Sequence, residues 1–242
     1  MRETRTFQRI NRAMGQAIHT YDMIQDGDRI ALGLSGGKDS LTLLHMMVER
    51  LARVPVEYSI HPIFIDPGFE NGFADALANH CRSLGLELTY EITDHGPEAH
   101  KEGNSVNPCF ICSRLRRKRL FELTSELGCA TLALGHNKDD IIETLLMNIF
   151  YSGQISTMMP NQSMFNGEIR VIRPLYLAEE PDIIKFANEQ NLPVFTNPCP
   201  SATRSKRSEV RTMLKELYAA NPSVKGNIFR SLSQVRLDYL LT

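Results

Sequence analysis

Residues 35–40 read SGGKDS and combine the residue types of an anion-binding loop. Two adjacent glycines let a backbone approach an anion closely, and a helix that begins here directs its N–H groups and its dipole at that anion. Ser35 and Ser40 add hydroxyl donors, and Lys38 adds a positive charge. The nucleoside-triphosphate P-loop, GxxxxGK followed by Ser or Thr, is absent. The alternative is a plain strand-to-helix turn capped by Asp39 or Ser40, but the crowding of lysine and serines around Gly-Gly favours phosphate binding.

A second polar segment, residues 135–140, reads GHNKDD and follows an apolar run. Two adjacent carboxylates near a triphosphate indicate Mg²⁺ binding, because Mg²⁺ prefers carboxylate and phosphate oxygens. Asp139 and Asp140 could instead be acids in the first turn of a helix, where they complement its dipole. From this segment alone, both interpretations stay open.

The five cysteines indicate metal binding or catalysis more than a disulfide framework, because their number is odd and residues 1–12 lack the apolar run of a signal peptide, which predicts a reducing compartment. Cys109 and Cys112 form a CxxC motif, which zinc sites, redox pairs and iron–sulfur clusters all use. No second CxxC completes a four-cysteine zinc site. Cys199 lies in a rigid Asn-Pro-Cys-Pro turn and could be a third ligand, which would leave one iron of a 4Fe-4S cluster open. Cys81 and Cys129 have apolar neighbours and are predicted to be buried hydrophobes.

The elements that must position these residues alternate between strands and helices. The predicted strands cover residues 29–34, 58–65, 86–92, 129–134 and 170–172, and the predicted helices cover 5–20, 71–83, 113–127, a run after residue 40 and a run up to Tyr151. This alternation predicts an α/β fold with a mostly parallel five-stranded sheet and helices on both faces. Ligands of such sheets bind at the carboxyl ends of the strands, where residues 35–40, 66–68 and 135–136 would meet. We predict an N-terminal helix in 1–25, an α/β domain over 26–178, and a helical C-terminal segment of the same domain over 179–242.

The distribution of charged and apolar residues indicates which partners the protein can bind and where in the cell it is found. The 242 residues carry a net charge of −1, so there is no overall cationic field for nucleic acid. Two local basic clusters, residues 114–119 and 204–211, follow the CxxC and Cys199 and could bind nucleic-acid phosphates. Five basic residues within six of a helix cannot all face one way, so some of them are only a solvated face. No stretch approaches the ~18 apolar residues of a membrane span, which predicts a cytoplasmic protein with no membrane contact.

Taken together, these motifs resemble those of a known superfamily. The SGGKDS loop after an apolar strand resembles the PP-loop of the ATP pyrophosphatases, and GHNKDD resembles their GHxxDD segment. From Phe7 to about Met213 the chain resembles the tRNA 2-thiocytidine synthetase family, in the stretches 17–28, 34–40, 109–117, 134–140, 145–153 and 172–175. The resemblance implies that ATP activates the carbonyl oxygen at position 2 of a cytosine in the tRNA anticodon loop, and that sulfur then displaces AMP. It also implies a 4Fe-4S cluster on Cys109, Cys112 and Cys199.

The resemblance extends to a set of site residues. The expected catalytic residues are Lys38, Asp39, Arg116 and Asp139. The expected residues for ATP and Mg²⁺ are Ser35, Gly36, Gly37, Lys38, Asp39, Ser40, Asp66, Gly135, His136 and Asp140. The expected cofactors are ATP, Mg²⁺ and the 4Fe-4S cluster, and the expected partners are tRNA, a sulfur donor such as a cysteine desulfurase, and a second copy of the chain.

One departure from the family pattern leaves alternatives open. The family usually has a second CxxC, followed by Gly-Ser, near the third ligand, whereas this chain has only Cys199 between two prolines. The first alternative is a PP-loop ligase or sulfurtransferase that adenylates a different RNA base or a small molecule. The second is a nucleotide-sensing or metal-binding module without catalysis, against which the intact Lys38, Asp39 and Asp139 argue.

Overall fold

The chain folds into two compact units in the computed structural model, which describes residues 3–101, 107–196, 199–200 and 206–239. The first is an α/β unit made of Met1–Asn137 and Met159–Ala202. The second is a helical unit made of Lys138–Met158 and Thr203–Thr242. We describe each unit by itself. The domain boundaries given above stay a prediction.

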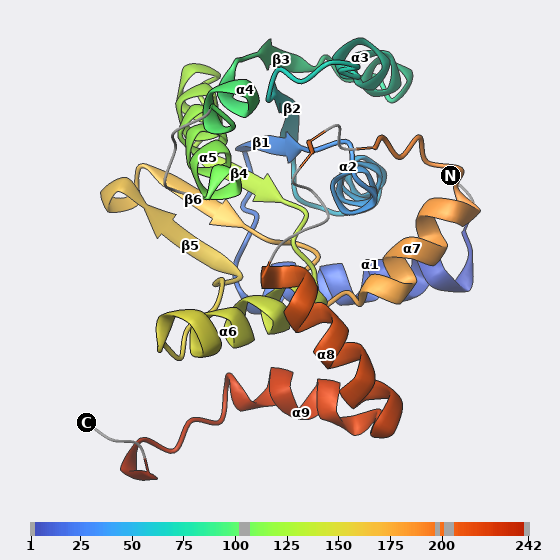
Figure 1. The fold of residues 1–242 in the computed structure, drawn as a ribbon. Helices are drawn as coiled ribbons and strands as arrows, with labels where there is room; N and C mark the ends of the chain where they lie inside the picture. Colours follow the sequence, from blue (N-terminus) through green and yellow to red (C-terminus); the bar gives the residue numbers. More distant parts are fainter. Residues whose placement is uncertain (1–2, 102–106, 197–198, 201–205, 240–242) are drawn as a thin grey trace. The chain divides into compact units, whose positions relative to one another are not determined.

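The α/β unit is built on one twisted sheet (Figure 1). Its strands are β1 (Asp28–Leu34), β2 (Tyr58–Asp66), β3 (Thr89–Ile92), β4 (Thr131–Leu134), β5 (Asn161–Met164) and β6 (Ile169–Ile172). They lie in the order β3-β2-β1-β4-β6-β5, and all pairs are parallel except β5 with β6. The α/β class and the mostly parallel sheet are therefore confirmed.

The predicted strand count of five was wrong, because the sheet has six strands. The missed strand, β5, reads NQSM and lacks the apolar run or alternation by which strands are recognised. It forms an antiparallel hairpin with β6, in which Asn161 pairs with Ile172 and Met164 pairs with Ile169. Because β5 is an edge strand, it needs no side chains that are buried on both faces.

The sheet has its switch point beside β1. From β1 the chain adds β2 and β3 on one side and then returns to place β4 on the other side. The segments that leave β1 and β4 therefore diverge at the carboxyl edge, which opens the crevice where ligands of such sheets bind. The loop 35–40 follows β1, and Gly135 follows β4.

Helices cover both faces of the sheet, as predicted. In Figure 1, α2 (Lys38–Leu51) and α5 (Pro108–Glu126) lie on opposite sides of the strands. Both contact strands of the sheet, as does α3 (Ala74–Ser83). Helix α7 (Glu180–Glu189) packs on α2 and on α1 (Arg5–Thr20), and the short α4 (His95–Ala99) packs on α5.

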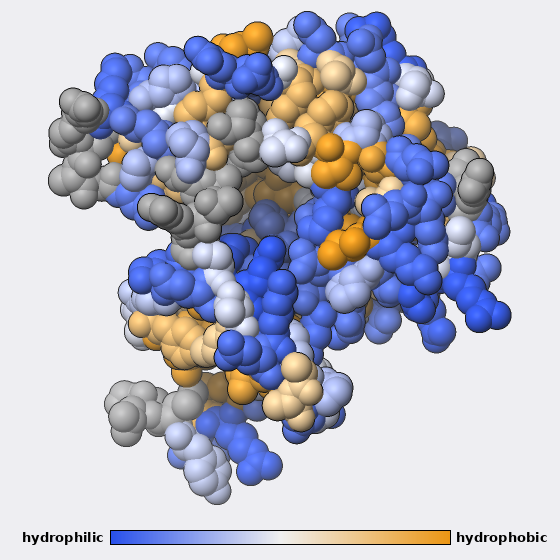
Figure 2. Space-filling view, turned by 45° about the vertical axis from the view of Figure 1, so that its right-hand side comes forward, coloured by the Kyte–Doolittle hydropathy of each residue, from blue (hydrophilic) through white to orange (hydrophobic). Residues whose placement is uncertain are grey.

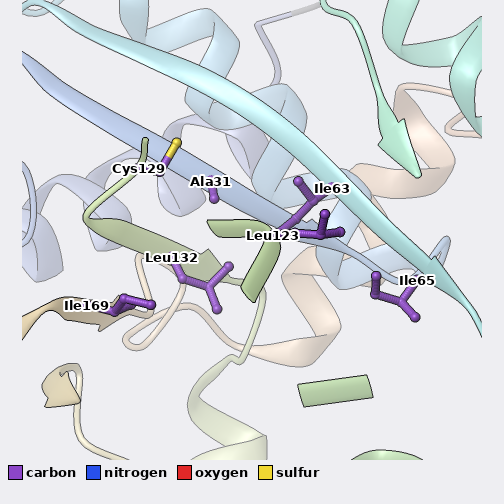
Figure 3. Close-up of a cluster of buried hydrophobic side chains, with 7 residues drawn as sticks. All are labelled: Ala31, Ile63, Ile65, Leu123, Cys129, Leu132 and Ile169. Carbon is purple, nitrogen blue, oxygen red and sulfur yellow. The ribbon is translucent and has the colours of Figure 1, made fainter. Parts of the chain in front are cut away.

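The core between the sheet and α5 is apolar (Figure 3). Its buried members are Ala31, Ile63, Ile65, Leu123, Cys129, Leu132 and Ile169. Cys81 on α3 is also fully buried, and burial raises the pKa of its thiol to about 11. The prediction that Cys81 and Cys129 are buried hydrophobes is confirmed.

The helical unit consists of α6 (Lys138–Ser152), α8 (Lys206–Ala220), α9 (Ser223–Ser231) and the 3-10 turn η2 (Leu237–Tyr239). Its small core contains Ile142, Val210 and Leu214. Across both units, no described helix combines the length and the apolar character that a membrane crossing requires. The face drawn in Figure 2 is mostly hydrophilic, and its hydrophobic residues gather in small groups, as on an ordinary globular surface.

A histidine pair joins α2 to α3 and makes stability depend on pH. The Nε2 atoms of His45 and His80 lie 2.9 Å apart, and their rings stack at 5.1 Å. Burial, and then the neighbouring His80, lowers the pKa of His45 to about 4, and burial also lowers the pKa of His80. Between the ordinary pKa of 6.5 and about 4, the unfolded chain therefore binds more protons than the folded chain. The stability should thus fall as the pH falls through this window.

We expect the melting temperature to drop between pH 6.5 and pH 4, and His45→Gln to make that drop shallower. Circular dichroism melts over this range measure both. His19→Gln, which changes an exposed histidine of α1, is the matched control. An equal drop in the wild type and the His45 variant would contradict the assignment.

Candidate active site

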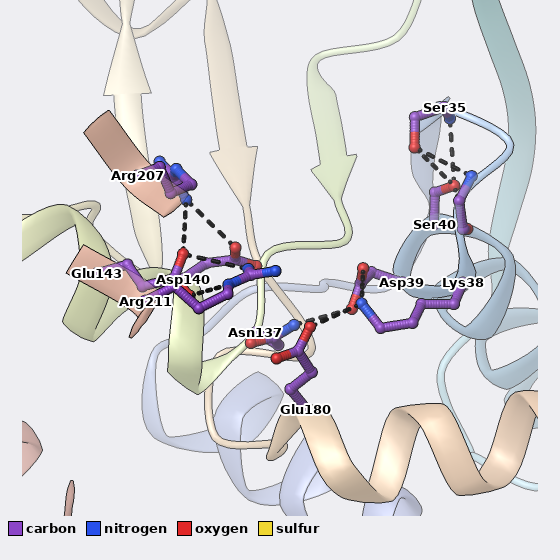
Figure 4. A network of polar contacts seen from close by, with 11 residues as sticks. Ser35, Lys38, Asp39, Ser40, Asn137, Asp140, Glu143, Glu180, Arg207 and Arg211 are labelled. Atoms are coloured by element: carbon purple, nitrogen blue, oxygen red, sulfur yellow. Dashed lines mark hydrogen bonds and ion pairs between the residues drawn. The ribbon is translucent and has the colours of Figure 1, made fainter. Parts of the chain in front are cut away.

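The loop 35–40 is shaped by its own serine hydroxyls (Figure 4). The backbone N–H of Ser35 donates to Oγ of Ser40 at 3.2 Å, and this hydroxyl donates to the carbonyl of Gly37 at 3.0 Å. Gly36 has a φ of +73°, which a residue with a side chain rarely adopts. The loop therefore turns tightly around its glycines at the carboxyl end of β1.

Helix α2 begins at Lys38, with Gly37 as its N-cap residue and no side-chain cap. The predicted alternative of a cap by Asp39 or Ser40 was therefore wrong, whereas phosphate binding by this turn stays a prediction. The first N–H groups of a helix have no partner within the helix itself. An uncapped helix start next to a Gly-Gly loop suits a phosphate group.

Lys38 lies between two carboxylates. Its Nζ is 2.9 Å from Oδ2 of Asp39 and 2.9 Å from Oε1 of Glu180, and Nδ2 of Asn137 donates to Oδ1 of Asp39 at 2.8 Å (Figure 4). Burial alone would lower the pKa of Lys38, but the two carboxylates outweigh it and raise the pKa above its usual value. The ammonium group is therefore positively charged at neutral pH, as binding of a phosphate requires.

Sequence reasoning missed Glu180 and Asn137. Glu180 is the first residue of α7 and lies more than a hundred residues beyond Lys38, so no local pattern links the two. Asn137 is 2% exposed and lies inside the GHNKDD segment. The predicted site residues of that segment were the glycine, the histidine and the two acids, but not the asparagine. A buried asparagine directly after a strand was the one available signal.

A pocket opens beside the loop. It is lined by Ser35, Gly37, Phe64, Asp66, Pro67, Gly72, Phe73, Arg116 and Phe195. Asp66 is 4% exposed, and its Oδ1 accepts the N–H of Gly68 at 2.9 Å. Nε of Arg116 is buried and has no hydrogen-bond partner among the described residues. The structure thus brings two predicted site residues, Asp66 and Arg116, to the predicted loop.

The CxxC motif lies on the first turn of α5. The predicted start of this helix at residue 113 was too late, because Asn107 caps it by accepting the N–H of Cys109 at 2.9 Å. Residues three apart on a helix share one face, so Cys109 and Cys112 are neighbours. Burial and then Cys199 raise the pKa of Cys109, and burial, Cys199 and Cys109 raise the pKa of Cys112. Cys199 is therefore within electrostatic range of both.

The three thiols are a chemically suitable donor set for iron or zinc, because both metals bind thiolates. No group of three or more His, Cys, Asp or Glu side chains among the described residues already has the geometry to hold a metal ion. Burial raises the pKa of Cys112, and the positive charge of Arg116 opposes this rise. Cys112 is therefore within electrostatic range of Arg116, which lines the pocket.

Comparison with known proteins agrees with this geometry. The family model described as PP-loop domain matches residues 5–217. A tRNA-cytidine(32) 2-sulfurtransferase of Geobacter sulfurreducens is 41% identical, with 97% of this chain and 93% of the relative covered. The enzyme of the same name from Pelobacter propionicus is 40% identical, with 100% and 91% covered. The chain belongs to the PP-loop family of tRNA-cytidine(32) 2-sulfurtransferases.

Solved structures place the fold in the same group. The U34-tRNA thiolase NcsA from Methanococcus maripaludis, solved with its 4Fe-4S cluster, has a TM-score of 0.76 and 27% identity, with 98% of this chain and 78% of that chain covered. The NH3-dependent NAD synthetase from Campylobacter jejuni has a TM-score of 0.52 and 17% identity, with 98% and 97% covered. The second likeness concerns the fold alone. The loop 35–40 is called the PP-loop from here on.

The basic residues after the CxxC have different surroundings. Arg116 faces the pocket, whereas Lys118 is exposed. Arg119 pairs with Glu91 at 2.6 Å and with Glu126 at 2.7 Å, and these carboxylates raise its pKa. The prediction that the cluster cannot act as one face is confirmed. Of the second cluster, Arg204 lies outside the described residues.

In the helical unit, both acids of GHNKDD form ion pairs, and Figure 4 draws the pair of Asp140 with Arg207. Asp139 and Asp140 lie in the first turn of α6, where they complement its dipole. Asp139 pairs with Lys225 at 2.7 Å, and Asp140 pairs with Arg207 at 3.3 Å. Each carboxylate that was predicted to hold Mg²⁺ already has a cation, so this arrangement does not fit Mg²⁺.

Gly135 and His136 follow β4 in the α/β unit. A Cβ on Gly135 would lie 3.0 Å from the carbonyl carbon and oxygen of Asp39 and from the backbone N of Ser40. The turn after β4 therefore touches the backbone of the PP-loop helix. Only glycine permits this approach without a shift of the loop.

We expect Gly135→Ala to weaken binding of a non-hydrolysable ATP analogue about tenfold, since the backbone of Asp39 and Ser40 must shift and such overpacking costs about 1–3 kcal/mol. Isothermal titration calorimetry measures the affinity, and circular dichroism verifies the fold. Gly226→Ala is the matched control, because a Cβ there meets nothing within 4 Å. Unchanged affinity in the Gly135 variant would show that this contact does not set the loop.

Proposed function

We propose that this chain is an ATP-dependent, iron–sulfur-dependent tRNA sulfurtransferase that converts a cytidine of the anticodon loop, cytidine 32, to 2-thiocytidine. One observation carries the proposal: α5 contributes residues to both halves of the site. Arg116 lines the pocket of the PP-loop, and Cys112 lies one helical turn before it on the same helix face. A phosphate-binding site and a thiol site that share one helix suit a reaction in which activation and sulfur transfer follow each other on one base.

In the activation step, the oxygen at C2 of cytidine attacks the α-phosphorus of ATP, and pyrophosphate leaves. Lys38 and the first N–H groups of α2 bind the pyrophosphate portion, while Asp39 and Glu180 hold the ammonium group in place. The unpartnered Nε of Arg116 stabilises negative charge that builds up at the α-phosphoryl group. Ser35, Gly36, Gly37, Ser40, Asp66, Gly135 and His136 are proposed as the remaining contacts of the nucleotide.

In the sulfur step, hydrosulfide bonds to C2, the bond from C2 to the original oxygen breaks, AMP leaves with that oxygen, and one proton is released. Where the donor delivers its sulfur as a persulfide, a thiol reductant first releases it as hydrosulfide. Cys109, Cys112 and Cys199 are proposed to hold a 4Fe-4S cluster, which fits their thiol chemistry and their mutual electrostatic range. When bound, such a cluster supplies one iron with an open position for sulfur. The raised pKa values of Cys109 and Cys112 mean that these thiols lose protons when they bind metal.

Further properties belong to the same proposal. We propose a sulfur donor such as a cysteine desulfurase, a homodimer and a cytoplasmic location, since tRNA substrates are found there. A role of Asp139 in catalysis, and of Asp139 and Asp140 toward the Mg²⁺ that accompanies ATP, stays a prediction. It requires Lys225 and Arg207 to release these carboxylates first.

Mass spectrometry of tRNA nucleosides tests the function. A strain that lacks this protein should lack 2-thiocytidine, and the wild-type gene should restore it. A Lys38→Ala gene should not restore it. An unchanged nucleoside profile, or pyrophosphate release that responds to a small metabolite and ignores tRNA, would defeat the assignment.

A further inference from the structure

Three aromatic rings stack from the core of the α/β unit to its PP-loop. The ring of Phe64, on β2, is 2% exposed and lies 5.1 Å from the ring of Phe73. Phe73 in turn stacks on Phe195 at 4.7 Å, with an angle of 6° between the ring planes. Because Phe64 is anchored in the sheet, the stack holds Phe195 in a defined place.

Phe195 is also bonded directly to the PP-loop. Its backbone N–H donates to the carbonyl of Gly36 at 3.0 Å. A Cβ on Gly36 would overlap the ring of Phe73 and would lie 3.2 Å from Cβ of Phe195. The left-handed turn at Gly36 and the ring stack therefore fit against each other, and neither can shift alone.

Phe195 lies four residues before Cys199. A chain spans at most about 3.6 Å per residue, so Cys199 must remain within about 14 Å of Phe195. Cys199 acts electrostatically on both Cys109 and Cys112. Because Phe195 is held in place, it limits the positions that the thiol of Cys199 can occupy.

We propose that Phe195 is a positioning residue that couples occupancy of the PP-loop to the position of Cys199. A phosphate in the loop restrains Gly36, and the hydrogen bond and ring stack transmit this restraint to the Cys199 segment. The coupling is reciprocal, so correct placement of Cys199 favours the binding-competent loop. This proposal rests on the proposed function for the nature of the ligand, a nucleoside triphosphate.

The test measures alkylation of Cys199 in the cluster-free, full-length chain, using iodoacetamide and peptide mass spectrometry. A non-hydrolysable ATP analogue should change the alkylation rate of Cys199 in the wild type about fivefold, the low end of coupling between sites. Phe195→Ala should lose this response, and Phe195→Tyr, which keeps the ring, should retain it. Val194→Ala is the matched control, because Val194 is the neighbouring residue and is 51% exposed.

The outcomes separate this proposal from the proposed function. If the analogue binds but the Phe195→Ala variant still responds like the wild type, the coupling role is wrong while the ATP site stands. If calorimetry finds no analogue binding to the wild type, both fail. Should Phe195→Ala not fold, Phe73→Leu removes the partner ring, and a full response in that variant would also overturn the proposal.

Discussion

Lys38→Ala is expected to reduce tRNA-dependent formation of AMP by a factor of about 100 or more, the usual cost of removing one group that stabilises charge in the transition state. Lys38 is the positive charge at the start of α2, and its pKa is raised, so it is fully protonated at neutral pH. Alanine removes this charge and leaves Asp39 and Glu180 facing the phosphates without compensation. Chromatographic measurement of AMP, with purified tRNA and ATP, gives the effect.

Lys185→Ala is the control for this experiment, because its side chain is 63% exposed and it pairs only weakly with Glu189, at 3.9 Å. That variant should keep the wild-type rate. The Lys38 variant should also keep its cluster absorbance, since Lys38 belongs to the ATP half of the site. Normal AMP formation by Lys38→Ala would remove the PP-loop from the mechanism.

Cys199→Ala is expected to abolish thiolation and to remove the visible absorbance of the cluster from anaerobically purified protein. A cluster held by three thiolates has no spare ligand. Loss of a direct ligand should cost more than the 10–100-fold that outer-shell partners of a metal cost. Cys109→Ala and Cys112→Ala should behave alike, because Cys199 lies within electrostatic range of both. Iron and sulfide analysis together with nucleoside mass spectrometry measures both effects.

Cys129→Ala is the matched control, since Cys129 is 4% exposed in the core beneath α5 and should retain iron when replaced. Colourless, zinc-loaded wild-type protein would contradict the cluster assignment. So would full iron content in the Cys199 variant. Neither result would contradict the ATP site, because the contacts of Lys38 and the place of Arg116 in the pocket do not involve the three cysteines.

The parts of this protein that its sequence determined are those set by short segments of the chain. The SGGKDS loop follows directly from an apolar strand and precedes a helix, and glycine conformation and helix N-termini act within a few residues. The alternation of strands and helices likewise dictates a parallel sheet whose carboxyl edge gathers the loops after β1, β2 and β4.

Local patterns failed where polar composition or a cap decided the structure. β5 has no apolar signature, because an edge strand gains its stability by pairing with β6. Helix α5 begins five residues earlier than its apolar periodicity suggests, because the Asn107 side chain caps it. That cap is what places Cys109 and Cys112 on a helix.

Only the tertiary structure decided which distant residues complete the site. Glu180 meets Lys38, Asn137 meets Asp39, and Phe195 meets Gly36, although each pair is separated by about a hundred residues or more. Local propensities act over a few positions and carry no record of such pairs. The contacts form because packing of α7 and of residues 192–196 against the rest of the α/β unit lowers the free energy of the whole chain. Sequence thus determined the chemistry at the PP-loop, and tertiary packing determined the groups that hold it in place.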